Sequence, residues 1–227
     1  MQPMIKLSLK GLAKYVASSP AAQRKILQGF KYPAADEPFA MRVHCREAMD
    51  CLKHYIRERH SPDWLQEQPR HLTSKVDGEA AKSIGRLRQN ARAVLLFERL
   101  FRTTGIEVLE TPSFRLTYHG MTISVVPDLC LLDGTRKKLV TIQSGSKKLA
   151  DQSVNVITQC MFEAANAGGY DLSASSCVYV DLPRESAHAA PRAGKRTLQD
   201  VEAACETITQ IWQSIPPPRK SKRSVAA

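Results

Sequence analysis

Two polar residues on either side of an expected β-hairpin have the chemistry to hold a metal ion. Asp128 follows Pro127 at the head of one apolar stretch, and Gln143 stands near the end of the next. Asp133-Gly134 lies between the stretches and predicts a type I′ turn, in which both central positions have positive φ. Antiparallel pairing is expected to bring Asp128 and Gln143 close together. A metal ion held there would suit phosphodiester chemistry.

A third candidate ligand, Glu98, lies in the helix predicted before these strands. The segment from 81 to 101 has an apolar stripe at helical spacing, formed by Leu87, Ala91, Val94 and Phe101, and Glu98 falls within it. A carboxylate that faces a core is costly unless it is paired or bound to a cation. Structural and functional explanations therefore stay open: an ion pair with Arg92 or Arg102, a place at the fraying edge of the stripe, a metal ligand or a tuned acid.

Strands and helices alternate around these candidates. Strands are expected over 106–108, 114–118 and 121–126, and His119-Gly120 predicts a hairpin between the last two. The hairpin that carries Asp128 and Gln143 follows. A helix capped by Asp151 is expected over 151–167, and a strand over 176–182 completes the series.

The N-terminal part is predicted to be helical. Residues 1 to 30 suggest two short helices, with Ser8 as an N-cap and Pro20 in the first turn of the second helix. Such a pair could read DNA as a helix-turn-helix, although plain packing helices are commoner. A third helix is expected over 39–60, and residues 61–80 are expected to be irregular.

The C-terminal part is predicted to be a linker, a helix and a tail. Residues 184–196 are rich in proline, alanine and charge, and the helix over 197–215 begins with Thr197 and Asp200, which resemble a capping box. Residues 216–227 are expected to be a disordered basic tail.

The composition favours a polyanionic partner. The formal net charge is +11 and the isoelectric point is about 9.5. The tail supplies four of these surplus charges, so seven lie elsewhere. No apolar run is long enough to span a membrane, no secretory segment is visible, and the six cysteines form no CxxC pair. We therefore expect a cytoplasmic protein with reduced thiols.

The order of elements from 81 to 182 resembles the restriction-endonuclease-like core of the PD-(D/E)xK nuclease superfamily. The resemblance rests on Pro127-Asp128, on Glu98 in the preceding helix and on the strand LVTIQSG. It implies a mixed α/β fold whose central mixed sheet is flanked by helices. The domains would then be a helical region over 1–80, the core over 81–183, the linker and C-terminal helix over 184–215, and the tail over 216–227.

The resemblance also implies roles for particular residues. Glu98, Asp128 and Gln143 would bind Mg²⁺ or Mn²⁺, and Asp128, Gln143 and Lys147 would be catalytic. Lys147 and Lys148 would contact DNA, and Gln159 in the next helix would point toward the substrate, as in certain exonuclease-like members. The chain departs from the superfamily pattern at two positions, because Gln143 replaces an acid and Gly145 replaces the lysine.

Two functions are compatible with these features. The first is a metal-dependent DNA nuclease, for which the superfamily suggests a setting in defence or on mobile elements. The alternative is a catalytically impaired nuclease-like domain that binds DNA, or a protein partner through its N-terminal or C-terminal helices. A basic scaffold that binds no nucleic acid is a third reading, and salt-dependent DNA binding would separate it from the others. No GxxxxGK[ST] loop for a nucleotide triphosphate is present.

Overall fold

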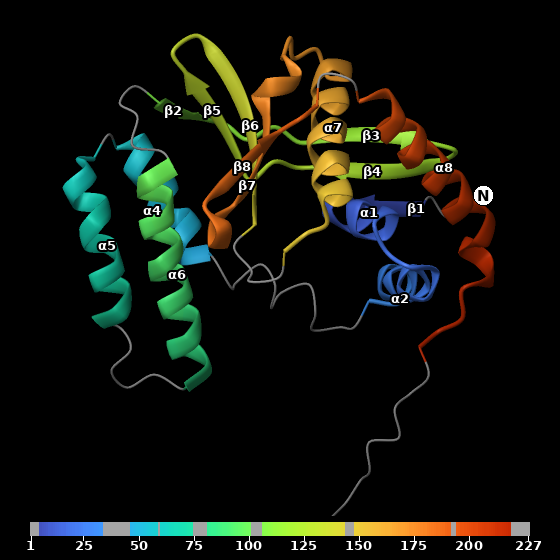
Figure 1. Ribbon diagram of the computed structural model, residues 1–227, viewed down its shortest axis with the longest axis horizontal. Helices are drawn as coiled ribbons and strands as arrows, with labels where there is room; N and C mark the ends of the chain where they lie inside the picture. The colour runs from blue at the N-terminus through green and yellow to red at the C-terminus, as the bar shows by residue number, and fades with distance from the viewer. Residues whose placement is uncertain are drawn as a thin grey trace, which may run out of the picture.

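The computed structural model describes residues 5–33, 46–58, 60–74, 81–100, 106–143, 148–191 and 194–218. Within these ranges the chain has a mixed α/β fold, with a five-stranded and a three-stranded sheet flanked by helices (Figure 1). The predicted fold class is therefore confirmed. In the same ranges, no helix combines the length and the apolar composition that crossing a bilayer requires.

The five-stranded sheet positions the candidate site. Its order is β2 (Ile106–Leu109), β5 (Leu129–Asp133), β6 (Arg136–Gln143), β7 (Cys177–Asp181) and β8 (Ser186–Ala189). β5 and β6 form the expected antiparallel hairpin, and helix α7 (Asp151–Ala167) then carries the chain to β7, which is parallel to β6. The start of β5 and the ends of β6 and β7 therefore lie at the same end of these three interior strands. We call this end of the strands the edge.

The turn between β5 and β6 lies one residue later than predicted. Asp133 pairs with Arg136, so the two loop residues are Gly134 and Thr135, and Gly134 has a φ of 61°. Asp133 instead stays in the strand, where its carboxylate accepts a hydrogen bond of 2.6 Å from Lys138 Nζ. In this register Leu129 lies opposite Val140, so the head of β5 lies beside residues 140–142 and not opposite Gln143; a turn at Asp133-Gly134 would have placed it farther still from Gln143.

The three-stranded sheet adds a strand that was not predicted. Its order is β1 (Ile5–Ser8), β4 (Met121–Val125) and β3 (Phe114–Tyr118). β3 and β4 form the predicted hairpin, in which His119 and Gly120 have φ values of 49° and 75°. β1 runs parallel to β4. Residues 1–30 are therefore not purely helical as expected, because the buried Ile5 and Leu7 alternate with exposed residues as in a strand.

Helices cover the two faces of the five-stranded sheet (Figure 1). Helices α1 (Leu9–Val16), α2 (Pro20–Lys31), α7 and α8 (Lys195–Ile211) share one core with Leu139 and Tyr179. The other core includes Val140 and Ile142, together with residues of α4 (Arg46–Arg57), α5 (Pro62–Ser74) and α6 (Ala81–Leu100). Successive side chains along β6 thus pack alternately into the two cores. The helices expected to form one region over 1–80 are divided between the two faces.

Two segments expected to be irregular have regular structure. α5 falls in the segment 61–80, because Leu65 and Leu72 are two turns apart and both are buried against α6. β8 falls in the expected linker, because Glu185 adopts a left-handed conformation with a φ of 52° and the chain turns back on β7. The segment after 184 is therefore part of the sheet.

The helix termini agree in part with the sequence. The Ser8 hydroxyl accepts a hydrogen bond of 3.2 Å from the Gly11 N–H, and α2 begins at Pro20, as predicted. Asp151 and Thr197 were expected near N-caps, but the capping positions are Ala150 and Gly194. The predicted helical residues 39–45 and the tail from 219 onward lie outside the described residues.

Candidate functional site

The candidate site is built at the sheet edge where β5 begins. Pro127 has no N–H to donate, so the ladder starts only after it. The Asp128 N–H donates to the Val140 carbonyl at 2.9 Å, and β5 begins at Leu129. Asp128 is thereby fixed at the head of the strand, where the sequence predicted it.

The Asp128 carboxylate has two donors on one oxygen. Oδ2 accepts a hydrogen bond of 2.7 Å from the Ile142 N–H and one of 3.1 Å from Lys10 Nζ. The Asp128 side chain is 31% exposed and the Lys10 side chain 49% exposed. An ion pair this accessible contributes at most about 1 kcal/mol to stability. Its main effect is to occupy Oδ2 of the candidate metal ligand Asp128.

Lys10 also bonds the backbone beside Asp128. Its Nζ donates to the Ile142 carbonyl at 3.2 Å, so the ammonium bridges a carboxylate oxygen and a carbonyl oxygen. These are the two kinds of oxygen that magnesium prefers in proteins. Lys10 reaches this position because β1 pairs with β4, α1 starts directly after β1, and β4 leads through Pro127 to Asp128.

Gln143 and a buried carboxylate lie side by side at the same edge. Gln143 ends β6 and is paired in register with Asp181, which ends β7. Alternation places both on the sheet face of Tyr179, which α7 covers. Asp181 is only 3% exposed, and Arg184 Nη1 contacts both of its carboxylate oxygens, at 3.0 and 3.2 Å. Arg184, three residues further along the chain, thus neutralises the buried Asp181 carboxylate.

Tyr179 lies directly beneath this edge in β7. Its hydroxyl is buried and has no hydrogen-bond partner among the described residues. Burial raises the pKa of the Tyr179 hydroxyl, and the negative charge of Asp181 raises it further, while Arg184 opposes the shift. The phenol therefore remains neutral and serves as a packing group in the core.

Of the other four predicted site residues, the structure describes the side chains of Lys148 and Gln159. Glu98 belongs to α6, but its side chain lies outside the described part, as does Lys147. Lys148 is exposed and pairs with Asp151 at 3.6 Å. Gln159 was expected to point toward a substrate, but it is only 3% exposed and its Nε2 donates to Glu163 at 3.3 Å. Gln159 faces the interior because α7 packs against α8 and the Gly194 backbone lies against the Gln159 side-chain amide.

The described side chains do not fit a magnesium site by themselves. Across the described ranges, no three His, Cys, Asp or Glu side chains lie close enough to hold a metal ion. Asp128 is paired with Lys10, and Asp181 with Arg184, so each carboxylate at this edge already has a cationic partner. A divalent cation that bridged Asp128 Oδ2 and the Ile142 carbonyl would displace the Lys10 ammonium.

Exposed lysines surround this edge. Lys10 and Lys14 are exposed one turn apart on α1, and Lys148 is exposed just before α7. The Ser153 hydroxyl in the first turn of α7 donates to the Ala13 carbonyl in α1 at 3.0 Å, which joins the two elements. We call Lys10, Lys14 and Lys148 the edge lysines. Lys10 is paired with Asp128 and Lys148 with Asp151, so the edge lysines exceed these two acids by one positive charge.

Three residues of this edge were missed from the sequence: Lys10, Asp181 and Arg184. Asp181 carried a local signal, because it ends an apolar strand and precedes a basic residue by three positions. Lys10 carried none, because its contact with Asp128 depends on the pairing of β1 with β4.

No protein-family model matches this chain, and no curated protein matches it.

Proposed function

We propose that this chain is a nuclease-like domain of the PD-(D/E)xK kind that binds DNA and whose hydrolytic centre is impaired. The observation that carries the proposal is the bridge made by Lys10 between the Asp128 carboxylate, at 3.1 Å, and the Ile142 carbonyl, at 3.2 Å. The resemblance implies a metal ion at this aspartate, whereas here an ammonium group lies between the two oxygens. Gln143 and Gly145 support the same reading, since an acid and a lysine are replaced.

The arrangement of elements supports the resemblance. Helix α6, the β5–β6 hairpin, helix α7 and the parallel strand β7 follow one another in the order on which the resemblance was based. Asp128 stands at the head of β5 and Gln143 at the end of β6, at one edge of the sheet.

The charge distribution supports DNA as the partner. The net charge is +11, and the edge lysines, Lys10, Lys14 and Lys148, lie on elements that meet beside Asp128. Lysines at this spacing contact backbone phosphates and read no sequence, so the expected binding is non-specific and salt-dependent.

Fluorescence anisotropy with a labelled DNA duplex tests the binding half of the proposal. Wild type should bind, and its affinity should fall steeply between 50 and 200 mM salt by about tenfold or more. The double variant Lys14→Gln/Lys148→Gln should bind more weakly and with a shallower salt slope. Arg88→Gln/Arg92→Gln on the exposed side of α6 removes the same charge elsewhere and should change little. Equal losses in both double variants would remove the edge lysines from the proposal.

The second candidate is an active metal-dependent DNA nuclease that uses Mg²⁺ or Mn²⁺. One observation favours it: Lys10 supplies an amino group beside Asp128. The resemblance calls for a lysine in this site, and the position where the superfamily carries it is occupied by Gly145. Linear and supercoiled DNA incubated with either metal would separate the two candidates. Cutting that Asp128→Ala abolishes would establish the nuclease. Intact DNA in the presence of a folded wild type that binds it would support the impaired domain.

A further inference from the structure

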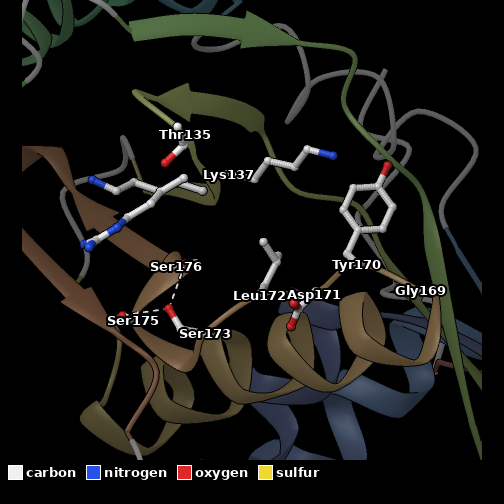
Figure 2. Close-up of a pocket in the computed structure, with 11 residues that line it drawn as sticks. Thr135, Lys137, Gly169, Tyr170, Asp171, Leu172, Ser173, Ser175 and Ser176 are labelled. Carbon is white, nitrogen blue, oxygen red and sulfur yellow. Dashed lines mark hydrogen bonds between the residues drawn. The ribbon is translucent and has the colours of Figure 1, made fainter.

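A polar pocket of about 630 Å³ lies at the end of β6 opposite to Asp128. β6 begins at Arg136, but its pairing with β7 begins only at Leu139, so residues 136–138 extend beyond β7. The segment from Gly169 to Ser176, which follows α7, closes the space between the two strands (Figure 2). The pocket thus arises from the unequal lengths of two neighbouring strands.

Cationic side chains line the β6 wall of this pocket. Arg136, Lys137 and Lys138 line it together, and Asp171 is the acid on the opposite wall. Lys138 is held by Asp133 at 2.6 Å. Lys137 extends toward Tyr170, and its Nζ lies 5.2 Å from the ring centroid, in a cation–π contact that holds the ammonium at the rim (Figure 2). The lining therefore has more basic than acidic side chains. Two of the basic residues, Arg136 and Lys137, are exposed.

Hydroxyl groups line the other wall. The Ser173 hydroxyl lies 2.9 Å from the hydroxyl of Ser175 and 2.9 Å from that of Ser176 (Figure 2). The two hydrogen bonds among these three hydroxyls use two of their three protons, so one O–H proton remains to donate to a ligand oxygen. Residues 136–138 of β6 have no partner in β7, so the backbone of Lys137 adds polar groups to the β6 wall.

We propose that this pocket binds a phosphate monoester group. Arg136 and Lys137, which approach from opposite faces of β6, would neutralise the dianion, and the one serine O–H proton that the hydroxyl cluster leaves free would donate to one of its oxygens. The volume is within the range of pockets for ligands of nucleotide size and exceeds the needs of a lone phosphate. Seven steps along β6 separate Arg136 from Gln143, roughly 23 Å, so this site is independent of the proposed DNA-binding edge.

Calorimetric titration of the full chain with adenosine monophosphate, adenosine and inorganic phosphate tests the proposal. Adenosine monophosphate should bind and adenosine should not. Arg136→Gln/Lys137→Gln should weaken binding by at least about tenfold, since two charge-assisted hydrogen bonds are lost. Ser173→Ala should have a smaller effect in the same direction. The matched control, Arg88→Gln/Arg92→Gln, should bind like wild type, and equal thermal midpoints would show that all variants are folded.

A second arm separates the possible sources of the phosphate. It compares a single-stranded oligonucleotide that carries a 5′-phosphate with the same strand that ends in a 5′-hydroxyl. Tighter binding of the phosphorylated strand, lost in Arg136→Gln/Lys137→Gln, would support the site and assign its phosphate to a nucleic-acid end. Failure of every phosphate probe to bind wild type, or an equal loss in the control variant, would overturn the proposal. Neither result depends on DNA binding at the Asp128 edge, which the duplex assay measures separately.

Discussion

Lys10 and Asp128 are 118 residues apart in the sequence, yet the Lys10 ammonium lies 3.1 Å from the Asp128 carboxylate. The same ammonium donates to the Ile142 carbonyl at 3.2 Å, and the Ile142 N–H donates to the carboxylate at 2.7 Å. These three groups form a closed arrangement in which a positive side chain lies between two oxygens. Helix α1 therefore supplies the cationic partner of an aspartate that lies just before β5.

Removing the Lys10 ammonium should expose a cation-binding pair of oxygens. Lys10→Ala leaves the Asp128 carboxylate with the Ile142 N–H and solvent, so we expect tighter Mn²⁺ binding than in wild type, by several-fold. Electron paramagnetic resonance of Mn²⁺ measures this directly. Lys10→Ala/Asp128→Asn is the matched control and should lose the gain. Unchanged Mn²⁺ affinity in Lys10→Ala would show that Lys10 does not take the place of a cation.

Arg184 should matter more to stability than an exposed basic residue does. Arg184→Ala leaves the buried Asp181 carboxylate without the contacts of 3.0 and 3.2 Å to Nη1. Breaking a fully buried pair costs roughly 3–5 kcal/mol, and the partial exposure of Arg184 reduces this to about 2 kcal/mol. Urea unfolding measures the free energy.

Lys148→Ala is the comparison for Arg184→Ala. Lys148 and Asp151 are both exposed, and their pair is 3.6 Å long, so its loss should change the free energy of unfolding by less than about 0.5 kcal/mol. Similar losses in the two variants would contradict the view that Arg184 neutralises a buried charge.

The elements around the site were predictable where their signals are local. The β3–β4 hairpin follows from His119-Gly120, and α7 has its predicted bounds, Asp151–Ala167, because its apolar residues recur at helical spacing. The position of the turn after β5 was wrong by one residue, since Asp133-Gly134 suits a turn but Asp133 is held in the strand by Lys138.

Long-range pairing accounts for what the sequence did not predict. β1 has four residues, of which only Ile5 and Leu7 are buried. An alternation this short does not predict a strand from the sequence, because the strand depends on its pairing with β4. Lys10 therefore could not be assigned to Asp128 from the sequence. The burial of Gln159 was unpredictable for the same reason, because it depends on the packing of α8 on α7.

Alkaline pH should destabilise the fold through its buried thiols. Burial raises the pKa of Cys160 to about 12, with smaller contributions from Cys205 and Glu163, and burial raises the pKa of Cys177 to about 12. A thiol with a raised folded-state pKa contributes stability that is fully present below its unfolded pKa, about 8.5, and is lost as pH rises toward 12. Urea midpoints should therefore fall between pH 8 and pH 10.

The same thiols should resist modification at neutral pH. Thiolate is the reactive form, and the buried cysteines Cys130, Cys160, Cys177 and Cys205 remain protonated. Alkylation followed by mass spectrometry should label the half-buried Cys51 before any of these four. Labelling of Cys160 at the rate of Cys51 in the native protein would count against the packing of α7 described above.

Gly194 tests whether Gln159 is a packing residue or a substrate contact. A Cβ at position 194 would overlap the Gln159 amide, and the Gly194 backbone, with φ −82° and ψ 1°, tolerates other residues, so the effect would be steric alone. Gly194→Ala should cost about 1–3 kcal/mol of unfolding free energy. Gln159→Ala should make the second substitution nearly neutral, because the amide that it would strike is gone. DNA affinity in Gln159→Ala should equal that of wild type, and a loss of DNA binding at unchanged stability would return Gln159 to the substrate-facing role that the resemblance implied.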